Sequence, residues 1–215
     1  MSRALVLGAL RTPIGKFMGG LSTLSAPDLG VAVVEALFKQ CAVTPEAVQE
    51  LIFGCARQAG SGPNPARQIA VRSGIPHTQS AYTVNMACGS GLLAITLGAE
   101  SIARGEHDLV VVGGTESMSR LPYYLEEARR GYRLGHGQLV DGMFRDGFHC
   151  PLADQLMGAT AENLAEEFGI TREQQDSYAV ESQERCQRAR EADLFRDEVV
   201  PVEVRQPKKS ILLER

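Results

Sequence analysis

The feature that most constrains this chain is a regular alternation of short apolar runs with helical segments over its first half. Apolar runs typical of buried strands occupy four segments: Arg3 to Ala9, Leu51 to Cys55, Ser80 to Ala87 and Asp108 to Val112. Helical segments follow each of the first three runs. Residues 26–41 and a short helix that starts at Thr44 follow the first, residues 64–74 the second, and residues 89–104 the third. Strands that alternate with helices predict an α/β fold whose mostly parallel sheet carries helices on both faces.

The pattern changes after Thr115. Residues 120–151 show little periodicity, and a loop of this length inside a compact unit is usually functional. Two helices are predicted beyond it, Thr160 to Phe168 and Arg172 to about Glu191, followed by a strand from Glu198 to Val204. With 215 residues the chain fits one domain or two small ones, and we expect a boundary between Thr115 and Arg120.

Composition excludes several classes of function. The 22 basic and 26 acidic residues give a net charge of -4 without long runs of either sign, so nucleic acid is not an expected partner. No apolar stretch reaches the roughly 18 residues of a membrane-spanning helix. Five scattered cysteines without zinc-type spacing predict reduced thiols and no metal site. We therefore expect a soluble, cytoplasmic protein.

One cysteine stands where chemistry is favoured. Cys88 falls where the strand ending near Ala87 gives way to a helix, between small residues in the run Ala87-Cys88-Gly89-Ser90-Gly91. Free amide donors and the positive end of the helix dipole favour a thiolate there, and the thiolate is the nucleophile. A small buried residue at a strand end explains Cys88 equally well. The helix itself is expected to face the core with Leu92, Ile95, Ala99 and Ile102.

A family resemblance extends over nearly the whole chain. Four segments carry it: Arg11-Thr12-Pro13-Ile14-Gly15-Lys16-Phe17, Asn85-Met86-Ala87-Cys88-Gly89-Ser90-Gly91, Gly113-Gly114-Thr115-Glu116-Ser117-Met118-Ser119 and Met157-Gly158-Ala159-Thr160-Ala161-Glu162-Asn163. In this order they resemble the thiolases, the family of acetyl-CoA acetyltransferases and 3-ketoacyl-CoA thiolases. The resemblance implies a layered thiolase fold with a nucleophile-bearing core domain over 1–117 and part of an inserted loop domain over 118–215.

The resemblance also implies a site. Cys88 would be the nucleophile that carries the acyl group, and its own N–H would donate to the thioester carbonyl oxygen. Phe148 and Met157 would line the channel for the pantetheine arm of coenzyme A, although packing of an apolar loop explains Phe148 almost as well. Leu156 stands where many biosynthetic members carry His, which leaves acyl length and reaction direction open. Coenzyme A thioesters would be substrates, with no metal or redox cofactor.

Partners follow from the same resemblance. The strand before Cys88 would lie at a dimer interface, and the Arg- and Tyr-rich segment Tyr123 to Gly137 would join dimers, so a homodimer or homotetramer is expected. The family's activating His, second Cys and water-holding Asn belong to a C-terminal thiolase domain that is absent from this sequence. His77, His107, His136 and His149 match none of them, so we expect little or no turnover.

Two other interpretations remain open at this point. A non-catalytic or complementing half-subunit would pair with a chain that supplies the missing residues. A ketoacyl synthase-like condensing enzyme shares the general fold and a nucleophilic Cys at the same strand–helix junction, but the segments Gly113 to Ser119 and Met157 to Asn163 favour a thiolase.

Overall fold

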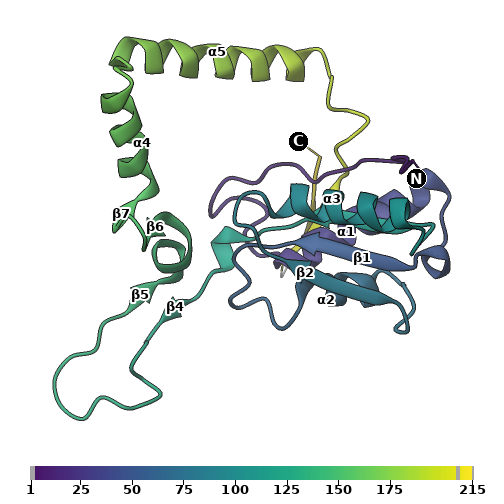
Figure 1. Cartoon of the computed structure of the whole chain (residues 1–215), viewed down its shortest axis with the longest axis horizontal. Coiled ribbons are helices and arrows are strands. Elements are labelled where there is room, and N and C mark those ends of the chain that lie inside the picture. The colour runs from purple at the N-terminus through teal and green to yellow at the C-terminus, as the bar shows by residue number, and fades with distance from the viewer. Residues whose placement is uncertain (1–2, 207–208, 215) are drawn as a thin grey trace. The chain divides into compact units, whose positions relative to one another are not determined.

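The computed structural model describes residues 3–206 and 209–214. The chain divides into two compact units, coloured along the sequence in Figure 1. The first unit combines the residues up to Leu121 with those from Glu198 onward, and the second is Pro122–Asp197. Each unit is described separately below.

A three-stranded parallel sheet forms the centre of the first unit. Its strands are β1 (Glu50–Gly54), β2 (Ser80–Val84) and β3 (Val110–Gly114), in the order β2-β1-β3. The register is even, because Gly54 at the end of β1 lies opposite Val84 of β2 and Gly114 of β3. All three strands therefore end at the same edge of the sheet.

Helices connect the strands and cover both faces. Helix α2 (Pro65–Arg72) links β1 to β2, and α3 (Ser90–Arg104) links β2 to β3. The two crossovers run in opposite directions across the sheet, and parallel crossovers are right-handed, so α2 and α3 cover opposite faces (Figure 1). The first helix, α1 (Ala26–Cys41), packs on α2, and a short 3₁₀ turn, η1 (Pro45–Ala47), follows it. The predicted α/β class is confirmed.

The face covered by α1 and α2 holds the main core. Leu51, Phe53 and Val111 point from the sheet into it and are buried with the following residues: Val34, Phe38, Val48, Ala66, Ile69, Ala70 and Ile75. Each fully buried large aliphatic side chain contributes about 1.5–3 kcal/mol to folding. Ser25 begins α1 with a capping box, in which its N–H donates to Asp28 at 2.8 Å.

Helix α3 packs on the other face through small residues, which corrects the sequence prediction. Its buried positions are Ser90, Ala94, Gly98 and Ser101, whereas Leu92, Ile95 and Ala99 are exposed and Ile102 is half-buried. The reason is the closeness of the helix to the strands: a Cβ built on Gly98 would lie 2.5 Å from a methyl carbon of Val112. The large apolar side chains are therefore left on the outer side of the helix.

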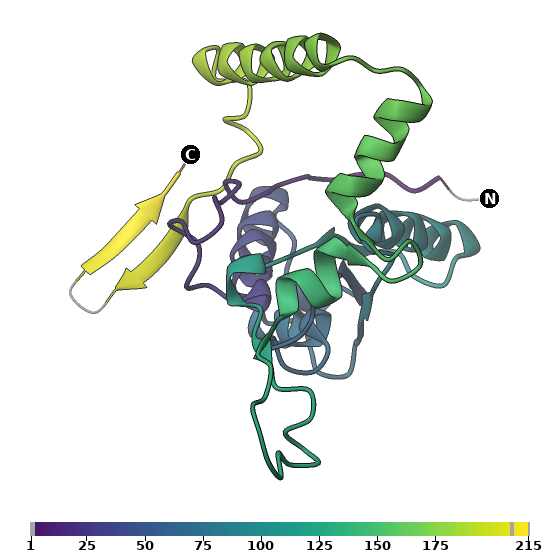
Figure 2. The same ribbon diagram turned by 90° about the vertical axis from the view of Figure 1, so that its left-hand side faces the viewer.

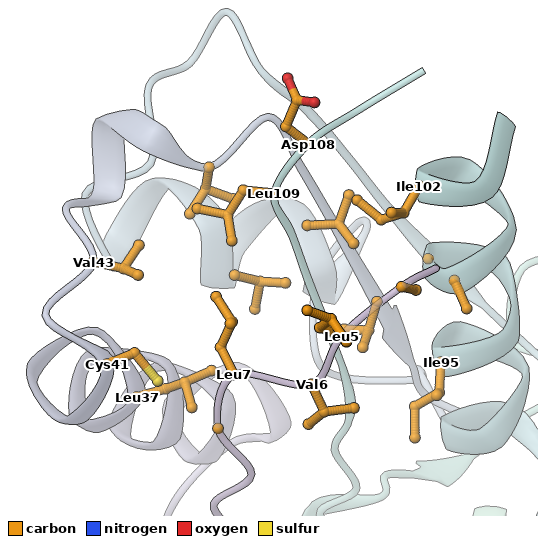
Figure 3. Close-up of a pocket in the computed structure, with 18 of the residues that line it drawn as sticks. Leu5, Val6, Leu7, Leu37, Cys41, Val43, Ile95, Ile102, Asp108 and Leu109 are labelled. Atoms are coloured by element: carbon orange, nitrogen blue, oxygen red, sulfur yellow. The ribbon is translucent and has the colours of Figure 1, made fainter. Parts of the chain in front are cut away.

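The N-terminal segment also differs from the prediction. Residues 3–10 form no strand with any part of the chain that the structure describes, and Leu5, Val6 and Leu7 are 79%, 83% and 65% exposed. An apolar slot with a volume of about 360 Å³ lies between this segment and β3 (Figure 3). Residues 3–10 make no ladder hydrogen bonds with β3 or with another described strand, so the strand predicted for Arg3 to Ala9 was wrong.

A hairpin returns the end of the chain to the first unit. Strands β8 (Val202–Gln206) and β9 (Lys209–Leu213) pair antiparallel (Figure 2). Val202 and Val204 are buried against Leu21, and the Arg11 guanidinium lies 2.7 Å from the Glu198 carboxylate. These contacts explain why residues from 198 group with the first unit, whereas the sequence analysis had placed them with the loop domain.

The second unit contains short strands and two helices. Strands β4 (Tyr123–Tyr124) and β5 (Val140–Asp141) pair with each other, as do β6 (His149–Cys150) and β7 (Gln155–Leu156). A π-helical turn, η3 (Phe144–Phe148), separates β5 from β6. Helix α4 spans Met157–Glu167, three residues longer at its start than predicted, and α5 spans Arg172–Glu191 as predicted. No helix in the described residues is long and apolar enough to cross a membrane.

Candidate active site

The site is built at the edge where the three parallel strands end. The segment after β1 begins with Cys55, the one after β2 with Asn85, and the one after β3 with Thr115. Cys55 N–H donates to the Val84 carbonyl at 3.1 Å and Thr115 N–H donates to the Gly54 carbonyl at 2.9 Å, so the three segments stay side by side. Open α/β sheets bind their ligands at this carboxyl edge.

A tight turn between β2 and α3 carries Cys88. Ser90 fixes the turn from one side, because its hydroxyl donates to the Ala87 carbonyl at 2.6 Å and accepts from Met86 N–H at 2.8 Å. Asn85 fixes it from the other, because its side-chain oxygen accepts from Ala87 N–H at 2.9 Å. Ala87 has a φ of 46°, in the left-handed region that non-glycine residues avoid. The residue directly before Cys88 is thus held in a strained conformation by named contacts.

The turn presents Cys88 to solvent at the start of a helix. Cys88 is exposed and has a free thiol, and α3 begins two residues later at Ser90 with Gly89 as its N-cap. None of the hydrogen bonds formed by the described residues of this turn uses the Cys88 N–H. Sequence reasoning therefore placed Cys88 correctly at a strand–helix junction, and the structure excludes the alternative of a small buried residue there.

Three glycines let the start of α3 approach the sheet. A Cβ built on Gly54 would lie 2.4 Å from the Ser90 carbonyl carbon and 2.7 Å from Gly91 N. A Cβ on Gly114 would lie 3.2 Å from the Cα of Gly91. Side chains at the ends of β1 and β3 would push the helix away, so glycine at these positions sets the depth of the Cys88 turn.

A second cysteine at the same edge has the opposite environment. Cys55 is 1% exposed, and its Sγ lies 3.6 Å from a Glu116 carboxylate oxygen. Burial, followed by the charge and hydrogen bond of Glu116, raises the pKa of Cys55 to about 12. A thiol of this kind stays protonated near neutral pH and is a poor nucleophile.

Two of the motifs face each other beside this edge. The segment Arg11–Phe17 and the segment Glu116–Ser119 line one cavity of about 310 Å³, together with Leu21 and Leu29. The Ser119 hydroxyl accepts from Met18 N–H at 2.9 Å, which ties the two segments together. The motif around Cys88 adjoins the segment Gly113–Ser119 where Gly91 packs on Gly114, since a Cβ on Gly114 would lie 3.2 Å from the Gly91 Cα, so three of the four motifs meet in the first unit.

The fourth motif lies in the second unit with both candidate channel residues. His149 of β6 pairs with Leu156 of β7, so Phe148 and Met157 directly flank this pair at one end of the hairpin. Phe148 is 38% exposed with its ring edge-on to Phe144 at a centroid distance of 5.9 Å, and Met157 is 48% exposed. The hairpin therefore brings the backbones of Phe148 and Met157 together locally.

The histidines of the first unit lie away from Cys88. His77 precedes β2, at the amino edge of the sheet, whereas Cys88 follows β2 at the carboxyl edge. The His107 ring lies 2.7 Å from the Ser101 hydroxyl, which is ~17 Å along α3 from Ser90 at 1.5 Å per residue. His149 of the second unit contacts Asp154 at 3.2 Å. Among the described residues no group of three or more His, Cys, Asp or Glu side chains is arranged to hold a metal ion.

The fold and this edge define an α/β protein with an exposed cysteine at a strand–helix turn. Residues 4–214 match the thiolase N-terminal domain, and the chain belongs to the thiolase family.

Relatives agree with this assignment. A probable acetyl-CoA acetyltransferase of Escherichia coli (strain K12) is 48% identical over 94% of this chain and 51% of its own length. The crystal structure of the Bacillus anthracis acetyl-CoA acetyltransferase matches with a TM-score of 0.96 at 36% identity, over 100% of this chain and 54% of that one. Acat5 thiolase from Ascaris suum in complex with coenzyme A matches with a TM-score of 0.86 at 41% identity, over 91% of this chain and 51% of that one. The chain thus spans about half the length of these relatives.

Sequence reasoning missed the residues that hold the turn. Asn85, Ser90 and Glu116 all lie inside the segments that carry the family resemblance, yet none of the three was singled out there. The available signal was the position of each polar residue directly after a strand or at the first turn of a helix, where side chains bond to free backbone groups.

Proposed function

We propose that this chain forms the nucleophile-bearing part of a thiolase that acts on acyl-CoA thioesters through an acyl-cysteine intermediate. The single observation that carries the proposal is the exposed Cys88 thiol in a strained turn at the start of α3, in a chain of the thiolase family. The family match favours this reaction over that of a ketoacyl synthase.

The first half-reaction uses groups of the Cys88 turn. In thiolysis the Cys88 thiolate attacks the 3-keto carbonyl carbon of a 3-ketoacyl-CoA, the bond between C2 and C3 then breaks, and acetyl-CoA leaves as a carbanion that takes up a proton. In condensation the thiolate attacks the thioester carbonyl carbon of acetyl-CoA, and the bond to the coenzyme A sulfur breaks after the new S–C bond has formed. Coenzyme A leaves as a thiolate and takes up a proton. The carbonyl oxygen carries negative charge in between, and the Cys88 N–H would donate to it. The proposal is supported by the hydrogen bonds of the described turn residues, none of which uses this N–H.

The second half-reaction transfers the acyl group onward. It passes either to coenzyme A, as in thiolysis of a 3-ketoacyl-CoA, or to the carbanion of acetyl-CoA, as in Claisen condensation. Both need a base and a second proton-transfer group, and the described histidines of the first unit lie away from Cys88. We therefore expect acylation of Cys88 but little or no turnover by the 215-residue chain.

The rest of the proposal concerns surroundings and assembly. The second unit would be the loop domain, with Phe148 and Met157 contacting the pantetheine arm of the thioester; both side chains are partly exposed at one end of the β6–β7 hairpin.

The outer edge of β2, which pairs only with β1 among the described strands, would form a dimer interface, and Tyr123–Gly137 would join dimers into a tetramer. Five free cysteines fit a reducing, cytoplasmic location.

The test is covalent labelling by acetyl-CoA. The chain is incubated with acetyl-CoA labelled in its acetyl group, and the modified residue is located by peptide mass spectrometry. We expect label on Cys88, no label on Cys55, and loss of the label in Cys88→Ser. Label distributed over the exposed cysteines, or rapid cleavage of acetoacetyl-CoA by the 215-residue chain, would contradict this proposal.

A second candidate, a complementing half-subunit, is favoured by the apolar slot in Figure 3. The slot lies between β3 and Leu5–Leu7, with α1 on one side and α3 on the other. A strand that occupied the slot would be covered by helices on both faces, as the strands of parallel sheets are. We propose as occupant an apolar strand from a polypeptide that corresponds to the half of the relatives this chain does not cover.

The slot has a direct test. The C-terminal half of the Escherichia coli relative is expressed as a separate polypeptide and mixed with this chain and with its Leu7→Asp variant. Co-elution of the two polypeptides, lost in Leu7→Asp, supports complementation. A chain that elutes alone in the presence of that polypeptide counts against it.

A further inference from the structure

The structure assigns to Glu116 a role as a positioning residue for the Cys88 turn, acting through the segment after β1. This inference rests on the proposed function, because it concerns the presentation of the Cys88 nucleophile. Glu116 is not in contact with Cys88 in any hydrogen bond of the described residues. Its effect must therefore pass through other groups, and the hydrogen bonds at the carboxyl edge supply a continuous path.

The path begins at the carboxylate. Glu116 accepts from Ala56 N–H at 3.0 Å and from Arg57 N–H at 3.2 Å, so both of its oxygens are used on the backbone after β1. Hydrogen bonds to a carboxylate belong to the stronger class of hydrogen bond. The turn of residues 55–57 is thus fixed by one negatively charged side chain.

The same turn holds Asn85. The Ala56 carbonyl, in the segment fixed by Glu116, accepts from the Asn85 side-chain amide at 3.1 Å. The side-chain oxygen of the same amide accepts from Ala87 N–H at 2.9 Å. Because an amide is planar, holding its nitrogen on Ala56 also orients its oxygen toward Ala87. Asn85 therefore transmits the position of residues 55–57 to the residue directly before the nucleophile.

Glu116 itself is held at a fixed place. The Thr115 hydroxyl donates to the Ala26 carbonyl at 2.7 Å, and the Ser117 hydroxyl donates to the Leu24 carbonyl at 2.6 Å. Both acceptors lie at the start of α1. A carboxylate anchored on both sides can impose a position on its neighbours, and Ala87, with its φ of 46°, is a residue that needs such support.

The test compares Glu116→Gln with Glu100→Gln in the full 215-residue chain. The glutamine introduced by Glu116→Gln keeps one acceptor oxygen and turns its amide hydrogens toward backbone donors, so we expect iodoacetamide to alkylate Cys88 about tenfold more slowly. Glu100 lies on α3 with an exposed ion pair to Arg104, and its loss should leave the rate unchanged.

Two readouts separate positioning from general stabilisation. Amide hydrogen exchange should increase at residues 55–57 and 85–88 in Glu116→Gln and stay unchanged in β1. The rate loss of the Glu116→Gln, Asn85→Ala double variant should equal that of Asn85→Ala alone, because both substitutions cut one path. Unchanged alkylation in a folded Glu116→Gln protein, or fully additive losses, would overturn the role of Glu116.

The result does not depend on the acetyl-CoA experiment. If acetyl-CoA fails to label wild-type Cys88 while Glu116→Gln still slows alkylation by iodoacetamide, the proposed reaction fails and the positioning role stands. If acetyl-CoA labels Cys88 equally in wild type and Glu116→Gln, the reaction stands and the positioning role fails.

Discussion

Cys55 and Cys88 follow neighbouring strands at one edge of the same sheet, yet their surroundings are opposite. Cys55 continues the line of β1, is 1% exposed, and contacts the Glu116 carboxylate at 3.6 Å. Cys88 lies beyond the end of β2 in a turn that lifts it to the surface at the start of α3. A cysteine is thus buried after β1 and exposed after β2.

The difference shows how a sheet edge can separate structural from reactive thiols. Glu116 contributes to both outcomes, because its charge disfavours a thiolate on Cys55 while its hydrogen bonds fix the backbone that supports Asn85. The Glu116 carboxylate therefore lowers the reactivity of Cys55 and fixes the backbone that supports the Cys88 turn. The following three predictions test this contrast.

The largest expected effect is on thiol reactivity. Since the pKa of Cys55 is raised from 9.0 to about 12, its thiolate fraction near pH 8 falls by roughly a thousandfold relative to an ordinary thiol. We expect iodoacetamide to modify Cys88 at least about a thousandfold faster than Cys55, measured by residue-resolved mass spectrometry.

Cys186 is the matched control for this measurement, because it is also exposed but lies within α5 rather than before a helix. Cys88 should react faster than Cys186 if its position at the start of α3 increases its reactivity. Equal rates at Cys88 and Cys186 would remove the helix-terminus argument, and equal rates at Cys88 and Cys55 would break the comparison itself.

A smaller effect is expected from Gly54→Ala. The added Cβ would lie 2.4 Å from the Ser90 carbonyl carbon, so the start of α3 must move away from the sheet. Such overpacking lowers the free energy of unfolding by about 1–3 kcal/mol, and the displaced turn should slow alkylation of Cys88. Denaturant unfolding and alkylation kinetics measure the two effects.

Gly158→Ala is the control for the glycine substitution. A Cβ on Gly158, within α4, would meet nothing within 4 Å, so this change should be neutral or raise helix stability by up to about 1 kcal/mol. A Gly54→Ala protein as stable and as reactive as Gly158→Ala would show that close packing at Gly54 does not set the position of Cys88.

The sequence predicted the elements whose signals are local. Helices α1 and α5 begin where the sequence predicted them, and the strand–helix alternation predicted the parallel sheet. The prediction failed where a partner decides the outcome. Leu5–Leu7 have the composition of a buried strand but no neighbour across the slot, and α3 turns its small residues, rather than Leu92 and Ile95, toward the sheet.

The site was predictable only at its most distinctive residue. Cys88 could be located because a strand, a cysteine and glycines followed one another. The path from Glu116 through Ala56 to Asn85 joins segments far apart in the sequence at each step, so no local pattern indicates it. Phe148 and Met157 came from the family resemblance, and their contact with a thioester stays a prediction.

The smallest expected effect is on the alkaline limb of the stability profile. Above pH 9.0 an unfolded Cys55 loses its proton while the folded one, with a pKa of about 12, keeps it. The folded state then binds more protons than the unfolded state, so this group makes stability fall as pH rises from about 9 to about 12. Cys55→Ala removes that contribution and should flatten the limb, measured by urea unfolding at several pH values. Cys186→Ala, at an exposed position, should keep the wild-type slope. A wild-type slope in Cys55→Ala as well would mean that Cys55 ionises alike in both states, and the contrast between the two strand ends would then rest on exposure alone.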